Sequence, residues 1–137
     1  MNVLVDSSVW SLALRRHRPP DVPAVDELRE LVRESRARLI GPIRQEILSG
    51  IRAPEDFSRL RERLQAFPDL PLGAEDFERA AEFFNACRRA GVQGSNTDFL
   101  VCAAAERHAL SILTTDGDFA RYARHLPVRL HECRPKQ

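Results

Sequence analysis

A chain of 137 residues has room for one domain built around one hydrophobic core. Hydrophobic residues make up 43% of it, charged residues make up 30%, and the net charge is +1, a balance that is typical of a globular protein. The three cysteines and four histidines are scattered, so neither a disulfide framework nor a structural zinc site is expected. All but one of the 21 basic residues are arginine. The single lysine, Lys136, excludes a P-loop and the phosphoryl-transfer sites that need a lysine beside an aspartate.

No segment of the sequence is suited to crossing a membrane. The longest apolar run covers residues 99–105, whereas a membrane-spanning helix needs about 18 apolar residues. The amino terminus also lacks a basic segment followed by a long apolar stretch, which would mark a secretory signal. We therefore expect a soluble, cytoplasmic protein with one domain over residues 1–137 and a tail at 132–137. Only RPKQ, at 134–137, is expected to lack fixed structure.

Short buried strands alternate with helices along the chain. Pro42 is favoured at a first helical position and begins one helix, and Gly91 ends the longest one. In chain order, the sequence predicts a strand at 2–5, helices at 7–16 and 24–35, a strand at 37–40, helices at 42–51 and 55–66, a strand at 70–72, helices at 74–91 and 98–109, a strand at 110–115, a helix at 116–126 and a strand at 128–130. This alternation predicts an α/β/α sandwich whose central, mostly parallel sheet has four to five short strands.

The apolar and acidic residues of the helices indicate which faces are buried. In the helix at 24–35, Val25, Leu28 and Val32 form one apolar stripe and are expected to face the core. Several acidic residues lie among arginines instead and are expected on solvated faces. They are Glu27, Glu30, Glu55, Glu62 and Glu82.

Three aspartates lie where a strand ends or a helix begins. Asp6 and Asp116 each follow a predicted strand, and ligands of parallel sheets collect beyond the carboxyl ends of the strands. Each of them also opens a predicted helix, where aspartate is a preferred cap, so capping and chemistry remain alternative roles for both. The same alternatives apply to Asp98. Its helix continues with an entirely apolar run and is therefore expected to be buried.

A glutamate joins them from the helix at 42–51. Ile43, Ile47 and Gly50 form the stripe that is expected to face the sheet, and Glu46 falls on the same stripe. An inward carboxylate is costly unless a partner or a metal meets it. We therefore expect four acids to face one crevice: Asp6, Glu46, Asp98 and Asp116.

The composition of this crevice predicts a hard cation. Four carboxylates without a counter-ion would repel one another and raise their own pKa values. A set of oxygen ligands with neither histidine nor cysteine suits Mg²⁺ or Mn²⁺, which chiefly serve phosphoryl chemistry.

The segments VLVDSSVW, PIRQEILSGI and TDFLVCAAAERHALSILTTDGDF, together with the closing strand, resemble the PIN-domain nucleases. The resemblance is closest to the VapC toxins of toxin–antitoxin pairs and runs over nearly the whole chain. It implies that the catalytic, metal-binding quartet is Asp6, Glu46, Asp98 and Asp116. Asp6 and Asp98 would be the direct metal ligands. Ser8 matches a hydroxyl position that supports the first aspartate, and Asp118 is either a further acid or a helix cap.

The same resemblance implies the activity and the partners. We expect a PIN-like fold and a Mg²⁺-dependent endoribonuclease, with Mn²⁺ as a possible substitute, that hydrolyses RNA phosphodiester bonds by a metal-activated water. Glu46 or Asp116 would assist proton transfer. A VapB-like antitoxin would neutralise the toxin, and a homodimer would align two sites along an RNA.

Arginines and aromatic residues are the candidates for contacts with RNA. The candidate arginines either contact phosphates or form ordinary surface charge. They are residues 15–18 (RRHR), Arg44 and Arg52 near the Glu46 helix, and Arg88 and Arg89. Some aromatic side chains could stack on bases or on an antitoxin helix, although we expect them in the core. These are Trp10, Phe83, Phe84 and Phe99.

Two other classes of function remain open. The first is a metal-dependent DNA nuclease or phosphatase of similar fold. A dehalogenase-like phosphatase would carry D-x-D-x-T after the first strand, whereas Ser8 occupies the third position here, and flap-type DNA nucleases have more acids and longer chains. The second is a catalytically silent PIN-like module that binds a protein partner. The four filled acidic positions argue against such a loss of function.

Overall fold

Three short parallel strands form the centre of the protein. The computed structural model describes residues 1–15 and 17–135. Strand β1 (Val3–Val5) lies between β2 (Ala37–Arg38) and β3 (Ser111–Leu113), and Val3 of β1 pairs with the first residue of each neighbour. All three residues of β1 are fully buried, as expected when helices cover both faces of a parallel sheet. The predicted parallel sheet is confirmed.

The two further strands expected at 70–72 and 128–130 are reduced to single bridges. Leu39 pairs with Asp69, and Ile112 pairs with Leu130, both in parallel orientation. Pro71 lies inside the first segment and Pro127 directly before the second, and a proline cannot donate a backbone hydrogen bond to a ladder. The sheet therefore keeps three full strands and is extended only locally at its two edges.

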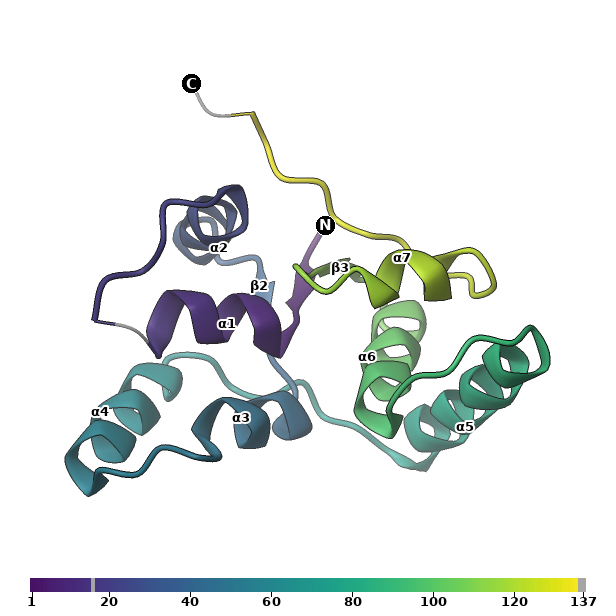
Figure 1. Cartoon of the computed structure of the whole chain (residues 1–137), viewed down its shortest axis with the longest axis horizontal. Coiled ribbons are helices and arrows are strands. Elements are labelled where there is room, and N and C mark those ends of the chain that lie inside the picture. Colours follow the sequence, from purple (N-terminus) through teal and green to yellow (C-terminus); the bar gives the residue numbers. More distant parts are fainter. Residues whose placement is uncertain (16, 136–137) are drawn as a thin grey trace.

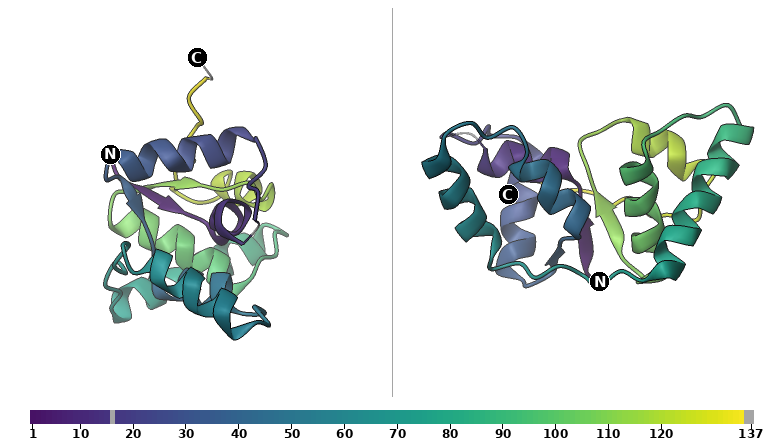
Figure 2. Two further views of the ribbon diagram at one scale, coloured as in Figure 1. Left: turned by 90° about the vertical axis from the view of Figure 1, so that its left-hand side faces the viewer. Right: turned by 90° about the horizontal axis from the view of Figure 1, so that it is seen from below.

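Helices form a layer on each side of the sheet. One layer contains α1 (Ser7–Leu14), α2 (Pro23–Arg33), α3 (Gly41–Leu48) and α4 (Pro54–Leu64). The other contains α5 (Ala74–Arg89), α6 (Asn96–Arg107) and α7 (Asp118–Ala123). Figures 1 and 2 show the two groups on opposite sides of the strands. The expected α/β/α arrangement is thus confirmed.

Helix α6 is the buried helix that the sequence predicts. Every residue from Phe99 to Ala105 is buried, and the helix packs against β1 and β3. Because its apolar residues surround the whole helix, α6 is fixed by packing on all sides. Asp98, in its first turn, lies directly before this buried run.

Several element boundaries and one buried stripe differ from the sequence-based expectation. Helix α1 ends at Leu14, two residues before the predicted end at Arg16, which lies outside the described residues. In α2, Leu31 is fully buried and Val32 is 38% exposed, so the expected stripe through Val32 is wrong by one position. Leu31 and Val32 are adjacent and both apolar, so the sequence pattern does not show which of them faces the core. In the structure, Leu31 does.

The prediction that Glu27 is solvated is also wrong. Glu27 is 3% exposed and lies 2.6 Å from Nε2 of His131, and both Nε and the backbone N–H of Arg134 donate to its other oxygen. Arg134 also donates to both carboxylate oxygens of Glu34, so the described part of the tail is fixed on α2. These partners are about a hundred positions away in sequence, and a helical pattern cannot reveal them.

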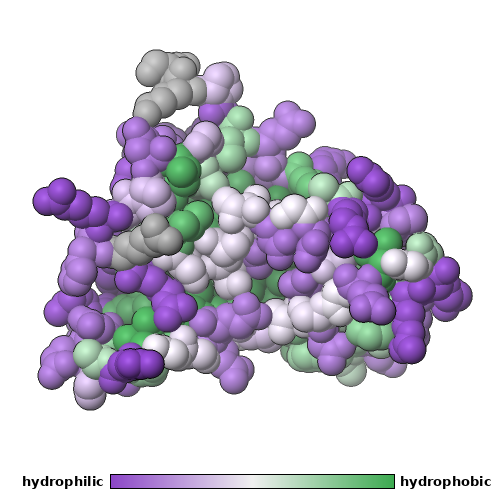
Figure 3. Space-filling view, in the orientation of Figure 1, coloured by the Kyte–Doolittle hydropathy of each residue, from purple (hydrophilic) through white to green (hydrophobic). Residues whose placement is uncertain are grey.

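One face of the protein surface is mostly polar. Figure 3 shows hydrophilic side chains over most of the visible face, with smaller apolar areas between them. Among residues 1–15 and 17–135, no helix combines the length and the apolar character that a membrane span requires.

Candidate active site

Asp6 lies at the carboxyl end of the central strand, directly before α1. Its backbone carbonyl accepts the first hydrogen bonds of α1, from Val9 and Trp10, but its side chain caps no helical N–H group. Instead, Oδ2 accepts hydrogen bonds from Ser8 Oγ at 2.8 Å and from Thr114 Oγ1 at 2.9 Å. The side chain is buried, so the capping alternative does not account for where this carboxylate points.

Two hydroxyl groups connect the ends of β1 and β3 at this point. Ser8 Oγ accepts from the backbone N–H of Thr115 at 3.1 Å and lies 3.3 Å from Thr114 Oγ1. Thr114 Oγ1 in turn accepts from the backbone N–H of Asp116 at 3.0 Å. The Asp6 carboxylate is therefore held by a network that also positions the loop carrying Asp116.

Asp98 lies in the first turn of α6. The cap of this helix is Ser95, whose hydroxyl accepts from the backbone N–H of Asp98 at 3.0 Å, so Asp98 does not cap its own helix. Its Oδ2 accepts a hydrogen bond from the hydroxyl of Tyr122 at 2.7 Å. Burial and the hydrogen bond to Asp98 raise the pKa of Tyr122, and the hydroxyl therefore stays protonated and donates.

The acids act on one another electrostatically. Burial raises the pKa of Asp98 above its ordinary value, and the negative charges of Asp6 and Asp116 raise it further. The hydrogen bonds from Tyr122 and Ser95 work in the opposite direction and are outweighed. The fold thus brings Asp6, after β1, and Asp116, in the loop after β3, close enough to Asp98 in α6 for their charges to act on it.

Asp116 lies in the turn between β3 and α7. Its Oδ1 accepts from the backbone N–H of Asp118 at 2.9 Å, which supports the first turn of α7. The residue is only half-buried, and Oδ2 accepts no hydrogen bond from the described residues. Asp118 is exposed and pairs with Arg121 at 3.7 Å, whereas Phe119 is fully buried and anchors the helix.

Glu46 is exposed, so the expectation that it points into the core is wrong. Ile43 and Ile47 are fully buried, but α3 ends at Leu48 and Gly50 adopts a left-handed conformation with φ of 84° outside the helix. The buried stripe of this short helix is therefore narrower than predicted and leaves Glu46 at its edge. Glu46 Oε2 accepts from Ser7 Oγ at 2.8 Å, which holds it beside the start of α1.

The four carboxylates suit a hard cation by their chemistry. Within the described part of the chain, none of them forms an ion pair with an arginine or a histidine. For Asp6, Glu46 and Asp116, the recorded hydrogen bonds reach one oxygen only and leave the other for a ligand. Among the same described residues, no group of three or more acids, histidines or cysteines is already arranged as a metal cage. Mg²⁺ does not require such a preformed group, because it binds one or two carboxylates and keeps several of its waters.

The sequence did not single out Thr114, Tyr122 or Ser7. Thr114 follows a buried strand and precedes Asp116, and this position at the sheet edge is the signal that could have found it. Tyr122 and Ser7 carry no comparable signal, because their roles depend on which side chains the fold places opposite them.

Most of the candidate contacts to RNA have structural roles or lie on the surface. Trp10, Phe83 and Phe99 are buried in the core as expected. Arg44 donates to Asp69 Oδ1 and to the carbonyls of Leu64 and Phe67, so it connects α3 to the segment after α4. The remaining arginines of this set are exposed where the structure describes them, at Arg15, Arg18, Arg52, Arg88 and Arg89.

Solved structures of toxin–antitoxin complexes share this fold. A chain of FitAcB from Neisseria gonorrhoeae has 22% sequence identity and a TM-score of 0.75, and the match covers 95% of this chain and 96% of that one. A chain of VapBC2 from Rickettsia felis, bound to a DNA fragment from its promoter, has 17% identity, a TM-score of 0.74 and coverage of 96% and 98%. A toxin–antitoxin complex from Klebsiella pneumoniae has 20% identity, a TM-score of 0.65 and coverage of 87% and 91%.

Sequence comparison defines the family. Among curated proteins, no sequence matches this chain. The PIN domain profile, by contrast, matches residues 3–125, from the central strand to the end of the last helix. This range includes the three aspartates, Glu46 and the hydroxyl network. The chain therefore belongs to the PIN domain family.

Proposed function

We propose that this protein is a VapC-like toxin that hydrolyses RNA as a Mg²⁺-dependent endoribonuclease. The observation that carries the proposal is the cluster of Asp6, Asp98 and Asp116 at the end of the sheet, where burial and the negative charges of the other two aspartates raise the pKa of Asp98. A cluster of acids that forms no ion pair with the described arginines is costly to keep unless it serves a cation.

Each acid has a proposed role. Asp6 and Asp98 would hold Mg²⁺ directly, and Mn²⁺ could replace it. The bound ion would lower the pKa of an attacking water and neutralise charge on the phosphate. Glu46, which Ser7 holds beside the start of α1, or Asp116 would assist proton transfer through its free oxygen. Ser8 orients Asp6 through its 2.8 Å hydrogen bond, and the exposed Asp118 has only a supporting role.

The antitoxin is the proposed regulator. The matched structures from toxin–antitoxin complexes support a VapB-like partner for this chain. Substitution of Asp98 by Asn separates cleavage from partner binding, because it removes one charge and leaves the shape of the side chain. We expect D98N to lose cleavage of RNA and to keep binding to the cognate antitoxin. Cleavage by D98N at the wild-type rate would reject the catalytic role of the cluster.

The same experiment distinguishes the two alternatives. Cleavage of DNA in preference to RNA, or release of phosphate from a monoester, would identify a different hydrolase of this fold. Antitoxin binding by the wild type with no hydrolysis of any of these substrates would identify a silent binding module. RNA is proposed here because of the family and the fold, since no base-reading residue distinguishes RNA from DNA.

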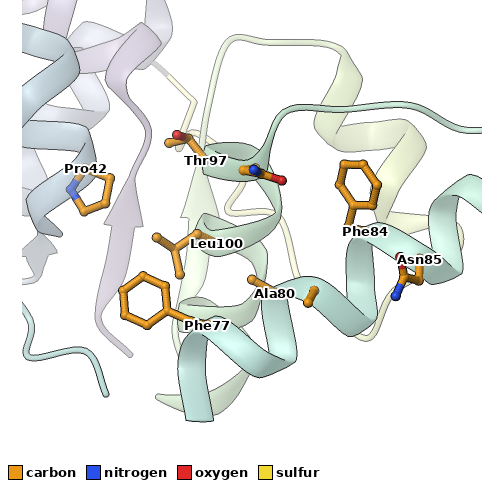
Figure 4. A pocket seen from close by; sticks show the side chains of 9 residues that line it. Pro42, Phe77, Ala80, Phe84, Asn85, Thr97 and Leu100 are labelled. Carbon is orange, nitrogen blue, oxygen red and sulfur yellow. The ribbon is translucent and has the colours of Figure 1, made fainter. Parts of the chain in front are cut away.

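We also propose that α5 forms the contact between two copies. This helix has a second apolar face beside the one in the core, with Phe77 53% exposed and Phe84 half-buried. Between these two rings lies a hollow of about 390 Å³ with Ala80 and Leu100 at its base, and Figure 4 shows the rings at its two ends. The hollow is lined by α5, α6 and Pro42 of α3. A protruding ring and a hollow beside it can fit each other across a two-fold axis.

The charges of α5 favour an antiparallel pairing of this kind. Glu75 lies in its first turn, and Arg88 and Arg89 lie in its last. Two antiparallel copies would place each acidic end opposite a basic end. We expect F77E to shift the protein from dimer to monomer in sedimentation experiments. Val32, which is 38% exposed on α2, supplies a matched control, and V32E should leave the dimer intact. Equal behaviour of the two variants would reject this interface.

A further inference from the structure

A buried tyrosine contacts the cluster from α7. Tyr122 has no exposed surface, and its ring packs against Phe99 and Phe119 with ring centroids 4.9 Å and 5.2 Å apart. Its hydroxyl donates to Asp98 Oδ2 at 2.7 Å. Because two aromatic neighbours fix the ring, the position of the hydroxyl does not depend on Asp98. The donor is therefore preorganised, and the carboxylate adapts to it.

A glycine provides the space for this contact. A Cβ atom on Gly94 would lie 2.3 Å from the hydroxyl oxygen of Tyr122, 2.7 Å from its Cζ and 3.0 Å from Cε2 of Phe99. The backbone of Gly94 is not in the left-handed region, so its conformation alone does not require glycine. The requirement is steric. The loop before α6 passes directly against the tyrosine hydroxyl, and only a residue without a side chain fits there.

We infer that Tyr122 is a positioning residue that fixes the Asp98 carboxylate for cation binding, and that Gly94 makes this contact possible. The inference rests on the proposed function, which assigns Asp98 as a metal ligand. The hydrogen bond holds one carboxylate oxygen against the protein. It thereby limits rotation of the side chain. Partners of metal-binding side chains commonly act in this way.

The Y122F variant tests the inference because it removes one oxygen atom and keeps the ring packing. We expect its affinity for Mn²⁺ or Mg²⁺, measured by calorimetric titration without RNA, to fall roughly 10- to 100-fold. Cleavage at low Mg²⁺ should fall similarly and recover as the Mg²⁺ concentration is raised. A merely structural hydroxyl would instead change the melting temperature and leave the metal affinity unchanged.

A second variant reaches the same contact from the other side. G94A should displace the tyrosine hydroxyl and weaken metal binding even though Tyr122 and Asp98 are both present. Gly73 supplies a matched control, because a Cβ atom there meets no atom within 4 Å and its φ is negative. G73A should therefore bind metal as the wild type does. Circular dichroism at the titration temperature verifies that each variant is folded.

The possible results separate this inference from the proposed function. Metal binding that is lost in D98N and weakened in both Y122F and G94A supports the inference. Binding that is lost in D98N but unchanged in folded Y122F overturns the role of Tyr122 and leaves the proposed function standing. A wild-type protein that binds neither Mg²⁺ nor Mn²⁺ overturns both.

Discussion

Thr114 Oγ1 donates a hydrogen bond to Asp6 Oδ2 at 2.9 Å and so connects the carboxyl ends of the two neighbouring strands β3 and β1. The same hydroxyl oxygen accepts from the backbone N–H of Asp116. One side chain thus positions two of the proposed catalytic acids. The relative positions of these side chains depend on the sheet register, which places Val5 opposite Leu113.

The T114V variant should weaken the site while the fold persists. Valine keeps the shape of threonine but neither donates to Asp6 nor accepts from Asp116. We expect a loss of about 1 kcal/mol in the free energy of unfolding and a drop of roughly 10- to 100-fold in RNA cleavage. Thr115 is exposed and supplies a neighbouring control. If T115V impairs cleavage as strongly as T114V, the hydroxyl network has no special role.

The D98N variant should show opposite effects on stability with and without metal. In EDTA, we expect it to melt at a higher temperature than the wild type, because it removes a partly buried charge that Asp6 and Asp116 repel. In Mg²⁺ at 100 times the dissociation constant, the wild type should gain about 2.7 kcal/mol from binding and become the more stable protein. Melting curves in the two buffers measure both effects. An identical order in both buffers would contradict metal binding by Asp98.

The buried Glu27, which lies outside the candidate active site, should make the stability of the protein depend on pH. Burial raises the pKa of Glu27, but hydrogen bonds from His131 and Arg134 outweigh it and lower the pKa below its ordinary value of 4.5. A carboxyl group with a lowered pKa in the folded state stabilises the protein above its unfolded pKa, and the contribution is lost as the pH falls through the folded value.

The E27Q variant measures this contribution. At pH 7 we expect it to be less stable than the wild type by about 1–3 kcal/mol, because the ion pair and its hydrogen bonds are weakened. Below pH 4.5 the difference in unfolding free energy between the two proteins should shrink, because the carboxyl group of Glu27 in the wild type becomes protonated and loses its charge. Urea unfolding at a series of pH values provides the data. A difference that does not change with pH would show that Glu27 acts through packing alone.

We propose that residues 1–137 form a single domain that includes the tail. The protein should then unfold in one transition whose calorimetric and van't Hoff enthalpies agree. Truncation after Leu130 removes both partners of Glu27, His131 and Arg134, and should lower the melting temperature without splitting the transition. Two resolved transitions in the full chain would contradict a single domain.

The sequence predicted the layers and the parallel sheet because both depend on short-range patterns. Buried strands, proline and glycine boundaries and the apolar run of α6 are local signals, and each segment carries its own. The positions of Asp6 and Asp116 at the sheet edge followed from the same reasoning, since a residue after a parallel strand has to lie at the carboxyl edge.

Contacts between distant segments could not be predicted in this way. The exposed position of Glu46 depends on where α3 ends, and the burial of Glu27 depends on a segment about a hundred residues away. Tyr122 resembles any core aromatic residue until the fold places Asp98 against its hydroxyl. Electrostatic partners of this kind are properties of the tertiary structure.

Mg²⁺-dependent cleavage of total RNA by the purified protein, freed of any co-purified antitoxin, tests the central claim most directly. An EDTA control and the D6A variant belong in the same experiment. The account predicts discrete RNA fragments with the wild type and Mg²⁺, and none in either control. Equal cleavage by D6A, or cleavage that persists in EDTA, would contradict a metal-dependent site built on Asp6.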